Sequence, residues 1–161
     1  MAEELKDISL SSKKSFRIDG DNNRIIYLDT SDMNILVRLE ETYPEIQKLA
    51  VEAGDKIVKA KISEGEEGDE EGASSLNDIT EVLKEIDSKM RVKLNYIFAS
   101  DIADICEPVG NMYDPIGGEF RFEHIIEVLT TLYANNITAE FSKMQERVKK
   151  HTEKYANKRR K

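Results

Sequence analysis

The stretch ITEVLKEIDSKMRVKLNYIF, residues 79–98, decides the fold class. Its large apolar residues recur in steps of three or four, as one face of a helix requires, at Ile79, Leu83, Ile86, Met90, Leu94 and Ile97. The pattern continues through Ile105 and ends at Pro108 and Gly110, while Ser75 or Asn77 can cap its start. The sequence therefore predicts a long amphipathic helix in a mainly α-helical protein.

An acidic segment, residues 63–75, precedes this helix and reads SEGEEGDEEGASS. It has no apolar residue larger than alanine, and residues 64–71 contribute six negative charges. Such a segment buries too little surface to offset the entropy lost on ordering, and its acids lack the fixed spacing of a calcium loop. We therefore expect a flexible acidic linker over 63–75, which separates a hairpin-plus-helix unit at 15–62 from a helical unit at 76–161.

The first of these units opens with SFRIDGDNNRIIYLD, residues 15–29. Two runs with β propensity, Phe16–Ile18 and Arg24–Leu28, flank glycine, asparagine and aspartate residues that suit a tight turn. This pattern predicts a small N-terminal β-hairpin. Residues 1–14 lack such a pattern and the apolar core of a secretory signal, and we expect them to be disordered.

A helix is expected after the hairpin, because Thr30, Ser31 and Asp32 each offer a capping oxygen. Apolar residues follow at helical spacing, at Leu36, Leu39, Tyr43, Ile46, Leu49 and Ala53. Pro44 lies within this stripe. Proline lacks the backbone N–H and clashes with the preceding turn, so a kink or a restart of the helix is predicted there.

The sequence GNMYDPIGGE, residues 110–119, is typical of a loop, and the last helix is expected to begin near Phe120. The loop carries three large apolar side chains, those of Met112, Tyr113 and Ile116. Together with Phe120, they either cover an edge of the core or dock a partner, since recognition residues often lie on loops held by rigid helices.

The last helix combines a long apolar stripe with a basic end. From Phe122 to Val148 the stripe spans about seven turns, roughly 40 Å, which is more than a small compact domain covers. Residues 142–161 hold nine Lys or Arg against two Glu, a balance of +7 in a chain whose formal charge is −8. The rest of the chain therefore carries −8 − 7 = −15. We expect a basic tail that projects from an acidic body.

Five basic residues of this tail are candidates for partner binding, namely Lys149, Lys150, Lys154, Arg159 and Arg160. Three interpretations stay open: a solvated helix end, a site for an acidic protein and a site for nucleic acid. The acidic balance of the whole chain repels phosphate and disfavours nucleic acid.

Catalytic chemistry has little support in the sequence. The chain contains no G-x-S-x-G, Walker, H-E-x-x-H or C-x-x-C motif. His124 is expected beside the core, His151 on the solvated tail, and Cys106 as a small buried residue surrounded by acids. We expect a non-enzymatic protein with no metal and no cofactor.

The cellular compartment is indicated by the single cysteine and by the hydropathy of the chain. One cysteine cannot form an internal disulfide framework, and no run approaches the roughly 18 apolar residues of a membrane span. These features predict a cytoplasmic protein without a membrane segment.

The layout resembles the small tail-assembly chaperones encoded by phages and prophages of Gram-positive bacteria. The resemblance lies in the opening SFRIDGDNNRIIYLD, the acid-rich helix after it, and the entry to the last unit, IADICEPVGNMYDPIGGEFRFEHIIEVL at 102–129. It implies a non-enzymatic helical protein that self-associates in the host cell cytoplasm and binds a tape-measure or tail-tube protein. The alternative is a regulatory or nucleic-acid-associated factor that acts through the basic tail.

Overall fold

The computed structural model describes residues 3–8, 10, 13–64 and 70–159, with only the backbone described at 61–64, 70–76 and 157–159. In this part of the chain the elements are β1 (Lys13–Arg17), β2 (Ile25–Asp29), α1 (Asn34–Glu64), α2 (Glu70–Phe98), α3 (Ala103–Cys106), β3 (Pro115–Ile116), β4 (Glu119–Phe120) and α4 (Arg121–Arg159). The prediction of a mainly α-helical protein with a small N-terminal hairpin and a long last helix is confirmed.

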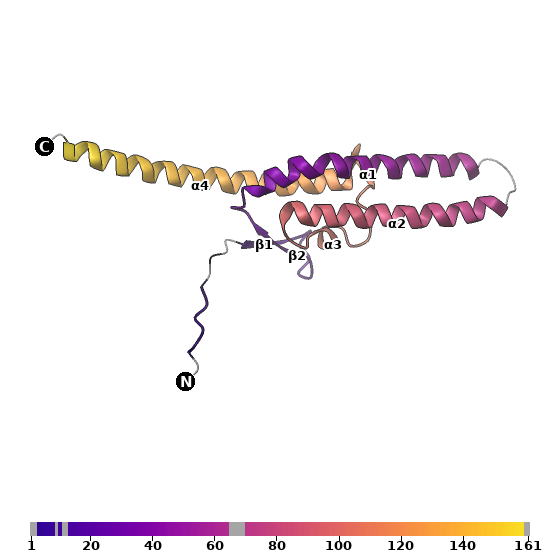
Figure 1. Cartoon of the computed structure of the whole chain (residues 1–161), viewed down its shortest axis with the longest axis horizontal. Coiled ribbons are helices and arrows are strands. Elements are labelled where there is room, and N and C mark those ends of the chain that lie inside the picture. Colours follow the sequence, from indigo (N-terminus) through magenta and orange to yellow (C-terminus); the bar gives the residue numbers. More distant parts are fainter. Residues whose placement is uncertain (1–2, 9, 11–12, 65–69, 160–161) are drawn as a thin grey trace.

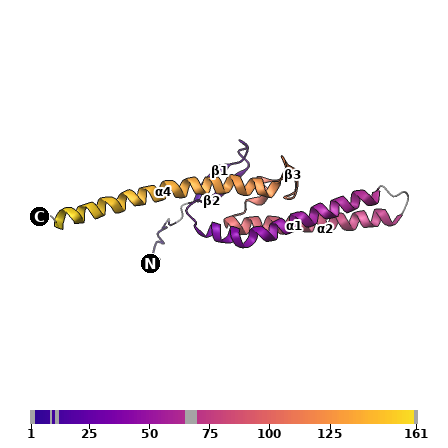
Figure 2. The same ribbon diagram turned by 90° about the horizontal axis from the view of Figure 1, so that it is seen from above.

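Helices α1 and α2 form an antiparallel pair and lie side by side in both views (Figures 1 and 2). Helix α1 continues to Glu64 and α2 already begins at Glu70. The predicted flexible linker over 63–75 is therefore wrong at both of its ends, while residues 65–69 lie outside the described residues. Glutamate and alanine are good helix formers, so two paired helices can extend beyond the last apolar positions of their stripes.

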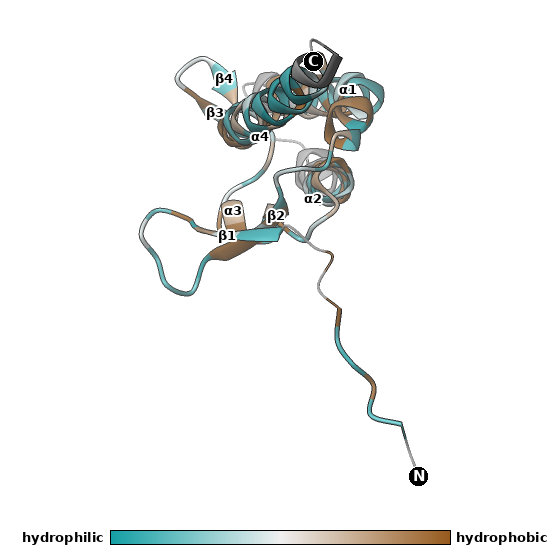
Figure 3. Ribbon diagram, turned by 90° about the vertical axis from the view of Figure 1, so that its left-hand side faces the viewer, coloured by the Kyte–Doolittle hydropathy of each residue, from teal (hydrophilic) through white to brown (hydrophobic). Residues whose placement is uncertain are grey.

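One hydrophobic core joins elements from before and after residues 65–69. Strand β2 contributes Ile26 and Leu28, α1 contributes Ile46, α2 contributes Leu94, and α4 contributes Phe122, all of them buried. Figure 3 shows the body end-on, with α1, α2 and α4 next to one another and the hairpin beside them. The units predicted at 15–62 and 76–161 thus share a single core.

Strands β1 and β2 pair antiparallel, with Phe16 opposite Ile26 and Lys14 opposite Leu28. The predicted hairpin is present, but β1 begins at Lys13, inside the range 1–14 that was expected to be disordered. The turn uses two residues with left-handed backbone, Asp19 at φ 51° and Gly20 at φ 70°, as glycine- and aspartate-containing turns commonly do.

Helix α1 is continuous from Asn34 to Glu64 with Pro44 inside it, so the predicted restart does not occur. Pro44 and the residue four positions earlier, Glu40, are both exposed. The carbonyl group that lacks a proline N–H donor therefore lies on the solvent side, where water can satisfy it. The opposite face of the same turns packs into the core through Ile46.

Helix α2 ends at Phe98, although the apolar pattern predicted a longer helix. Ala99 has a φ of 49°, the left-handed conformation that commonly ends helices. The Asn95 side-chain oxygen then accepts hydrogen bonds from the N–H groups of Ile102 and Ala103, both at 2.9 Å, and starts α3. The break turns the chain back, so that the Ile102 side chain is fully buried.

Two arginines from the N-terminal third of the chain hold the ends of helices that lie far along the sequence. Arg38 donates to the carbonyl of Ile97 in the last turn of α2 at 2.9 Å, and pairs with Asp32 at 2.6 Å. Arg24 donates to the last two carbonyls of α3, at 2.9 and 2.8 Å. These bonds satisfy carbonyl groups that have no partner within their own helices.

A third arginine, Arg91 of α2, organises the loop after α3. Its guanidinium pairs with Asp87 at 2.8 Å and donates to the carbonyls of Glu107 at 2.8 Å and Gly110 at 2.7 Å. Asp87 in turn accepts the N–H of Met112 at 2.7 Å. The Arg91 and Asp87 side chains are 16% and 14% exposed, so this network is shielded from most of the solvent.

The stretch 110–119 was predicted to be a plain loop, but it contains strand β3, a turn and the first residue of β4, which together begin a second small hairpin. Strands β3 and β4 pair antiparallel, with Pro115 opposite Phe120. Gly117 and Gly118 form the turn with φ values of 59° and 85°. Two successive positive φ values match the tight turn that strand twist favours, and glycine adopts them without strain.

The left-handed backbone of Ala99 predicts that a glycine substitution there stabilises the protein, whereas glycine inside a helix usually destabilises it. We expect Ala99→Gly to raise the free energy of unfolding by about 0.5–1 kcal/mol, because glycine removes the strain that a Cβ atom causes in this conformation. Ala139→Gly, at an exposed position inside α4, should lower it by about 1 kcal/mol. Urea unfolding followed by helical circular dichroism measures both. A destabilised Ala99→Gly chain would contradict the assigned helix end.

The Arg91 network provides a second prediction. Arg91→Ala should lower the free energy of unfolding by about 2–4 kcal/mol, because it leaves Asp87 and two backbone carbonyls without their donor. Lys89→Ala is the matched control on the same helix, where the exposed pair with Glu85 contributes at most about 0.5 kcal/mol. Equal urea midpoints for the two variants would show that the network does not stabilise the fold.

Candidate functional site

The C-terminal half of α4 extends beyond the body of the molecule (Figures 1 and 2). The first half packs on the core through Phe122, Leu129 and Tyr133, which are all buried. From residue 138 to residue 156 every side chain is exposed. The basic end therefore projects, as the length of the apolar stripe predicted.

The projecting half keeps an apolar face without a core to cover it. We call this face the α4 stripe and define it as Ile137, Phe141, Met144, Val148 and Tyr155. The last four of these side chains are between 41% and 63% exposed. Their spacing of four, three, four and seven residues places them on one side of the helix. Exposed apolar residues on a single helix face are the usual mark of a binding surface.

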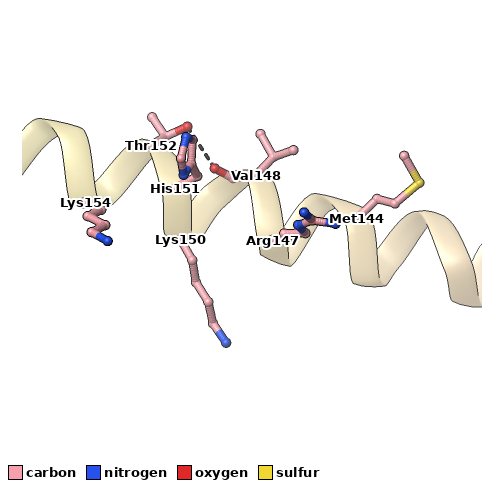
Figure 4. A pocket seen from close by; sticks show the side chains of 7 residues that line it. All are labelled: Met144, Arg147, Val148, Lys150, His151, Thr152 and Lys154. Carbon is pink, nitrogen blue, oxygen red and sulfur yellow. Dashed lines mark hydrogen bonds between the residues drawn. The ribbon is translucent and has the colours of Figure 1, made fainter.

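His151 lies on the same side of the helix, seven residues after Met144. Its ring meets the edge of Tyr155 with 4.8 Å between the ring centres. Figure 4 shows Met144 and Val148 on one side of the helix and Lys150 on the other. All the side chains of this view come from one helix, so they form an open face and enclose no cavity.

Basic residues occupy the other sides of the same projecting helix. Lys149, Lys150 and Lys154 are exposed on α4, as expected for residues that contact a partner or solvent. Arg159 belongs to α4 by its backbone, and Arg160 lies outside the described residues. The structure thus combines the basic tail and the apolar stripe on one projecting helix.

A groove of about 360 Å³ lies where the α4 stripe meets the body, and we call it the junction groove. Its apolar lining comes from Met33, Ile137, Phe141 and Met144. At its edge Lys14 of β1 donates a hydrogen bond to the Asn136 side chain of α4 at 2.6 Å. Sequence reasoning missed this groove, because no local pattern links the N-terminal hairpin to a helix more than 100 residues later.

Two of the proposed docking residues in the 110–119 loop are corrected by their burial. Met112 is fully buried and Tyr113 is 9% exposed, so both belong to the core and do not present their side chains to a partner. Ile116 and Phe120 are half-buried. The Phe120 ring stacks on Phe122, with ring centres 5.8 Å apart and an angle of 19° between the planes. Of the two interpretations of this loop, covering the core fits Met112 and Tyr113.

A second groove, of about 450 Å³, separates the N-terminal hairpin from the first half of α4. Phe16 and Ile18 line one side, Val128 and Leu132 line the other, and Cys106 contributes to the lining. Burial raises the pKa of the Cys106 thiol to about 11, more than the nearby Arg24 guanidinium lowers it. A thiol that stays protonated at neutral pH is a poor nucleophile.

His124 is exposed, and not at the core boundary as expected. Its ring nitrogen and the carboxylates of Glu119 and Glu127 lie within 4.8 Å of one another, a group of ligand types that could hold a metal ion. The sequence signal for part of this group was the spacing of three between His124 and Glu127 on one helix. All three residues are exposed, so a cation there would compete with full hydration of its ligands.

The chain matches no known family model, no curated protein and no solved structure. Among the described helices, none is both long enough and apolar enough to cross a bilayer. The candidate site therefore has to be interpreted from its own geometry.

The shielded thiol yields a reactivity prediction. At about pH 8, a thiol with a pKa near 11 has roughly a hundredth of the thiolate of a thiol at its ordinary pKa of 9.0. Iodoacetamide should therefore alkylate native Cys106 about a hundredfold more slowly than Cys106 in concentrated urea. Mass spectrometry of timed samples measures both rates.

The raised pKa of Cys106 also makes the stability of the fold depend on pH in a definite direction. The native state keeps the Cys106 proton to higher pH than the unfolded chain does, so this contribution to stability is lost as pH rises from about 9 to about 11. Cys106→Ala should remove this part of the alkaline loss of stability. Equal alkylation rates in native and unfolded protein would contradict the burial of the thiol.

Proposed function

We propose that the chain is a non-enzymatic assembly factor, of the kind of the phage tail-assembly chaperones, that binds a helical client along the α4 stripe. The client in this proposal is a tape-measure or tail-tube protein in the cytoplasm of the host cell. The factor would hold the apolar side of the client and keep it from premature association. Self-association of the factor belongs to the same proposal.

The observation that supports this function is the exposed apolar face of a helix that is already formed. Amphipathic helices bind in grooves or beside other helices through residues at i, i+3, i+4 and i+7, and Phe141, Met144 and Val148 occupy positions i, i+3 and i+7 of this pattern. Since the helix exists before binding, association does not pay for ordering its backbone. The exposed Lys149, Lys150 and Lys154 favour an acidic client, because opposite charges steer the encounter.

The alternative function is nucleic-acid association through the same tail. It is favoured by one observation, the exposure of Lys149, Lys150 and Lys154 on a projecting helix. The formal charge of −15 on the rest of the chain opposes it, because the body would repel phosphate. The apolar stripe has no role in a contact that is limited to phosphates.

Binding to a defined probe separates the two functions. The probe is a synthetic amphipathic helix with leucine at its a and d positions and glutamate beside them, and fluorescence anisotropy measures the dissociation constant. The variant Phe141→Ser/Met144→Ser/Val148→Ser should weaken binding about a hundredfold, since three half-buried contacts of about 1 kcal/mol each are lost. The melting temperature should not change, because none of the three side chains belongs to the buried core.

A matched control uses another exposed apolar residue. Val92 of α2 is 68% exposed and lies outside the stripe, so Val92→Ser should leave the affinity for the probe unchanged. Duplex DNA is the competing probe. Salt-dependent DNA binding that Lys149→Gln/Lys150→Gln/Lys154→Gln abolishes, together with a stripe variant that binds the helix normally, would establish the alternative.

A further inference from the structure

The segment before β1 carries apolar side chains that nothing covers. We call the described residues 3–8 and 10 the N-terminal arm; they have no regular secondary structure and all are exposed. Leu5, Ile8 and Leu10 are 98%, 80% and 92% exposed, although each would gain free energy from burial. Figure 3 shows the arm leading away from the body.

We infer that the N-terminal arm folds back in the same chain and docks along the α4 stripe, with Leu10 and Ile8 on the apolar face of the projecting helix. The path begins at the junction groove, where Lys14 already contacts Asn136 of α4. The arm is therefore tethered at the edge of the surface that it covers.

The direction of the strand agrees with this path. Phe16 and Ile18 line the second groove together with Val128 and Leu132, whereas Lys14 contacts Asn136. Strand β1 thus runs antiparallel to α4. An arm that kept this direction upstream of Lys14 would follow α4 toward its C-terminus.

The rise per residue places the apolar side chains of the arm at the level of the stripe. An extended chain rises about 3.3 Å per residue and a helix about 1.5 Å, so one arm residue matches about two helix residues. Starting from Lys14 at Asn136, Leu10 reaches roughly residue 145 and Ile8 roughly residue 149 of α4. These levels are those of Met144 and Val148. In a strand, Ile8 and Leu10 share the side of Lys14 and Phe16, which face α4.

The charges of the two segments are complementary. Residues 1–12 carry Glu3, Glu4 and Asp7 against one lysine, a balance of −2, whereas residues 142–161 carry +7. The same charge argues against a second α4 as the occupant of the stripe, because two such tails side by side repel each other. An acidic arm with apolar side chains matches both the apolar stripe and the positive net charge of the projecting helix.

Disulfide trapping in the full-length chain tests the docking without any client. In a Cys106→Ala background, Leu10→Cys/Met144→Cys should form an intramolecular disulfide at least about tenfold faster than Leu10→Cys/Glu146→Cys, whose helix position faces away from the stripe. All three positions are exposed, so the substitutions do not disturb the core. Equal rates for the two pairs, or disulfides that form only between chains, would overturn the inference.

A charge exchange provides a second, independent measurement on the same pair. Lys149→Glu/Lys150→Glu/Lys154→Glu should slow the Leu10–Met144 disulfide severalfold, and adding Glu3→Lys/Glu4→Lys/Asp7→Lys to that chain should restore the rate. If the arm substitutions do not restore the disulfide rate, the acidic arm and the basic tail do not attract each other.

One consequence rests on the proposed function, namely that the docked arm competes with the client. Deleting residues 1–10 should then tighten binding of the acidic amphipathic probe severalfold, as removal of a competing state does. If the Leu10→Cys/Met144→Cys disulfide forms fast but the amphipathic probe does not bind, the arm contact is supported and the proposed function is rejected. Probe binding that the deletion leaves unchanged would overturn the competition.

Discussion

The fold depends on arginine side chains that satisfy the carbonyl groups at the ends of distant helices. Arg38 of α1 closes the last turn of α2, and Arg24 from the hairpin closes α3. Arg91 holds the loop that leads into the small hairpin before α4. A helix end that is buried without such partners costs free energy, so these bonds allow α2 to end early and the chain to turn back into the core. This reversal of the chain after Phe98 also brings α4 beside α1, where the rings of Tyr43 and Phe122 lie with their centres 5.8 Å apart.

Helix α4 is longer than the hydrophobic core that it covers. Tyr133 is the last fully packed side chain of α4, and Ile137 is half-buried at the junction groove. Beyond it the helix continues with hydroxyl side chains that bond their own preceding turn, such as Thr138 to Ala134 and Thr152 to Val148. Basic residues near its C-terminus also interact favourably with the helix dipole. The projecting half is thus a preformed helix whose apolar face lacks a partner within the body.

Local pattern predicted most of the elements, and the errors arose where distant residues decide. The stripe from Ile79 to Ile97 predicted α2, yet its end at Phe98 depends on Asn95 and on Arg38, which no spacing reveals. Composition predicted a linker at 63–75, but pairing with a second helix extends α1 and α2 into that range. For the site, the basic tail and its projection followed from charge and length. Burial of Met112 could not be predicted, because it depends on its backbone bond to Asp87.

The inferred contact would join an arm without regular secondary structure to a helix that is already formed, and this difference would let the contact act as a switch. Ordering the arm costs backbone conformational entropy, whereas the projecting helix is already formed. The side chains of Ile8 and Leu10, which share the side that faces α4, gain free energy by burial. In the proposed function, a preformed helical client pays less ordering cost than the arm does, so it would displace the arm from the α4 stripe without any change in the body of the protein.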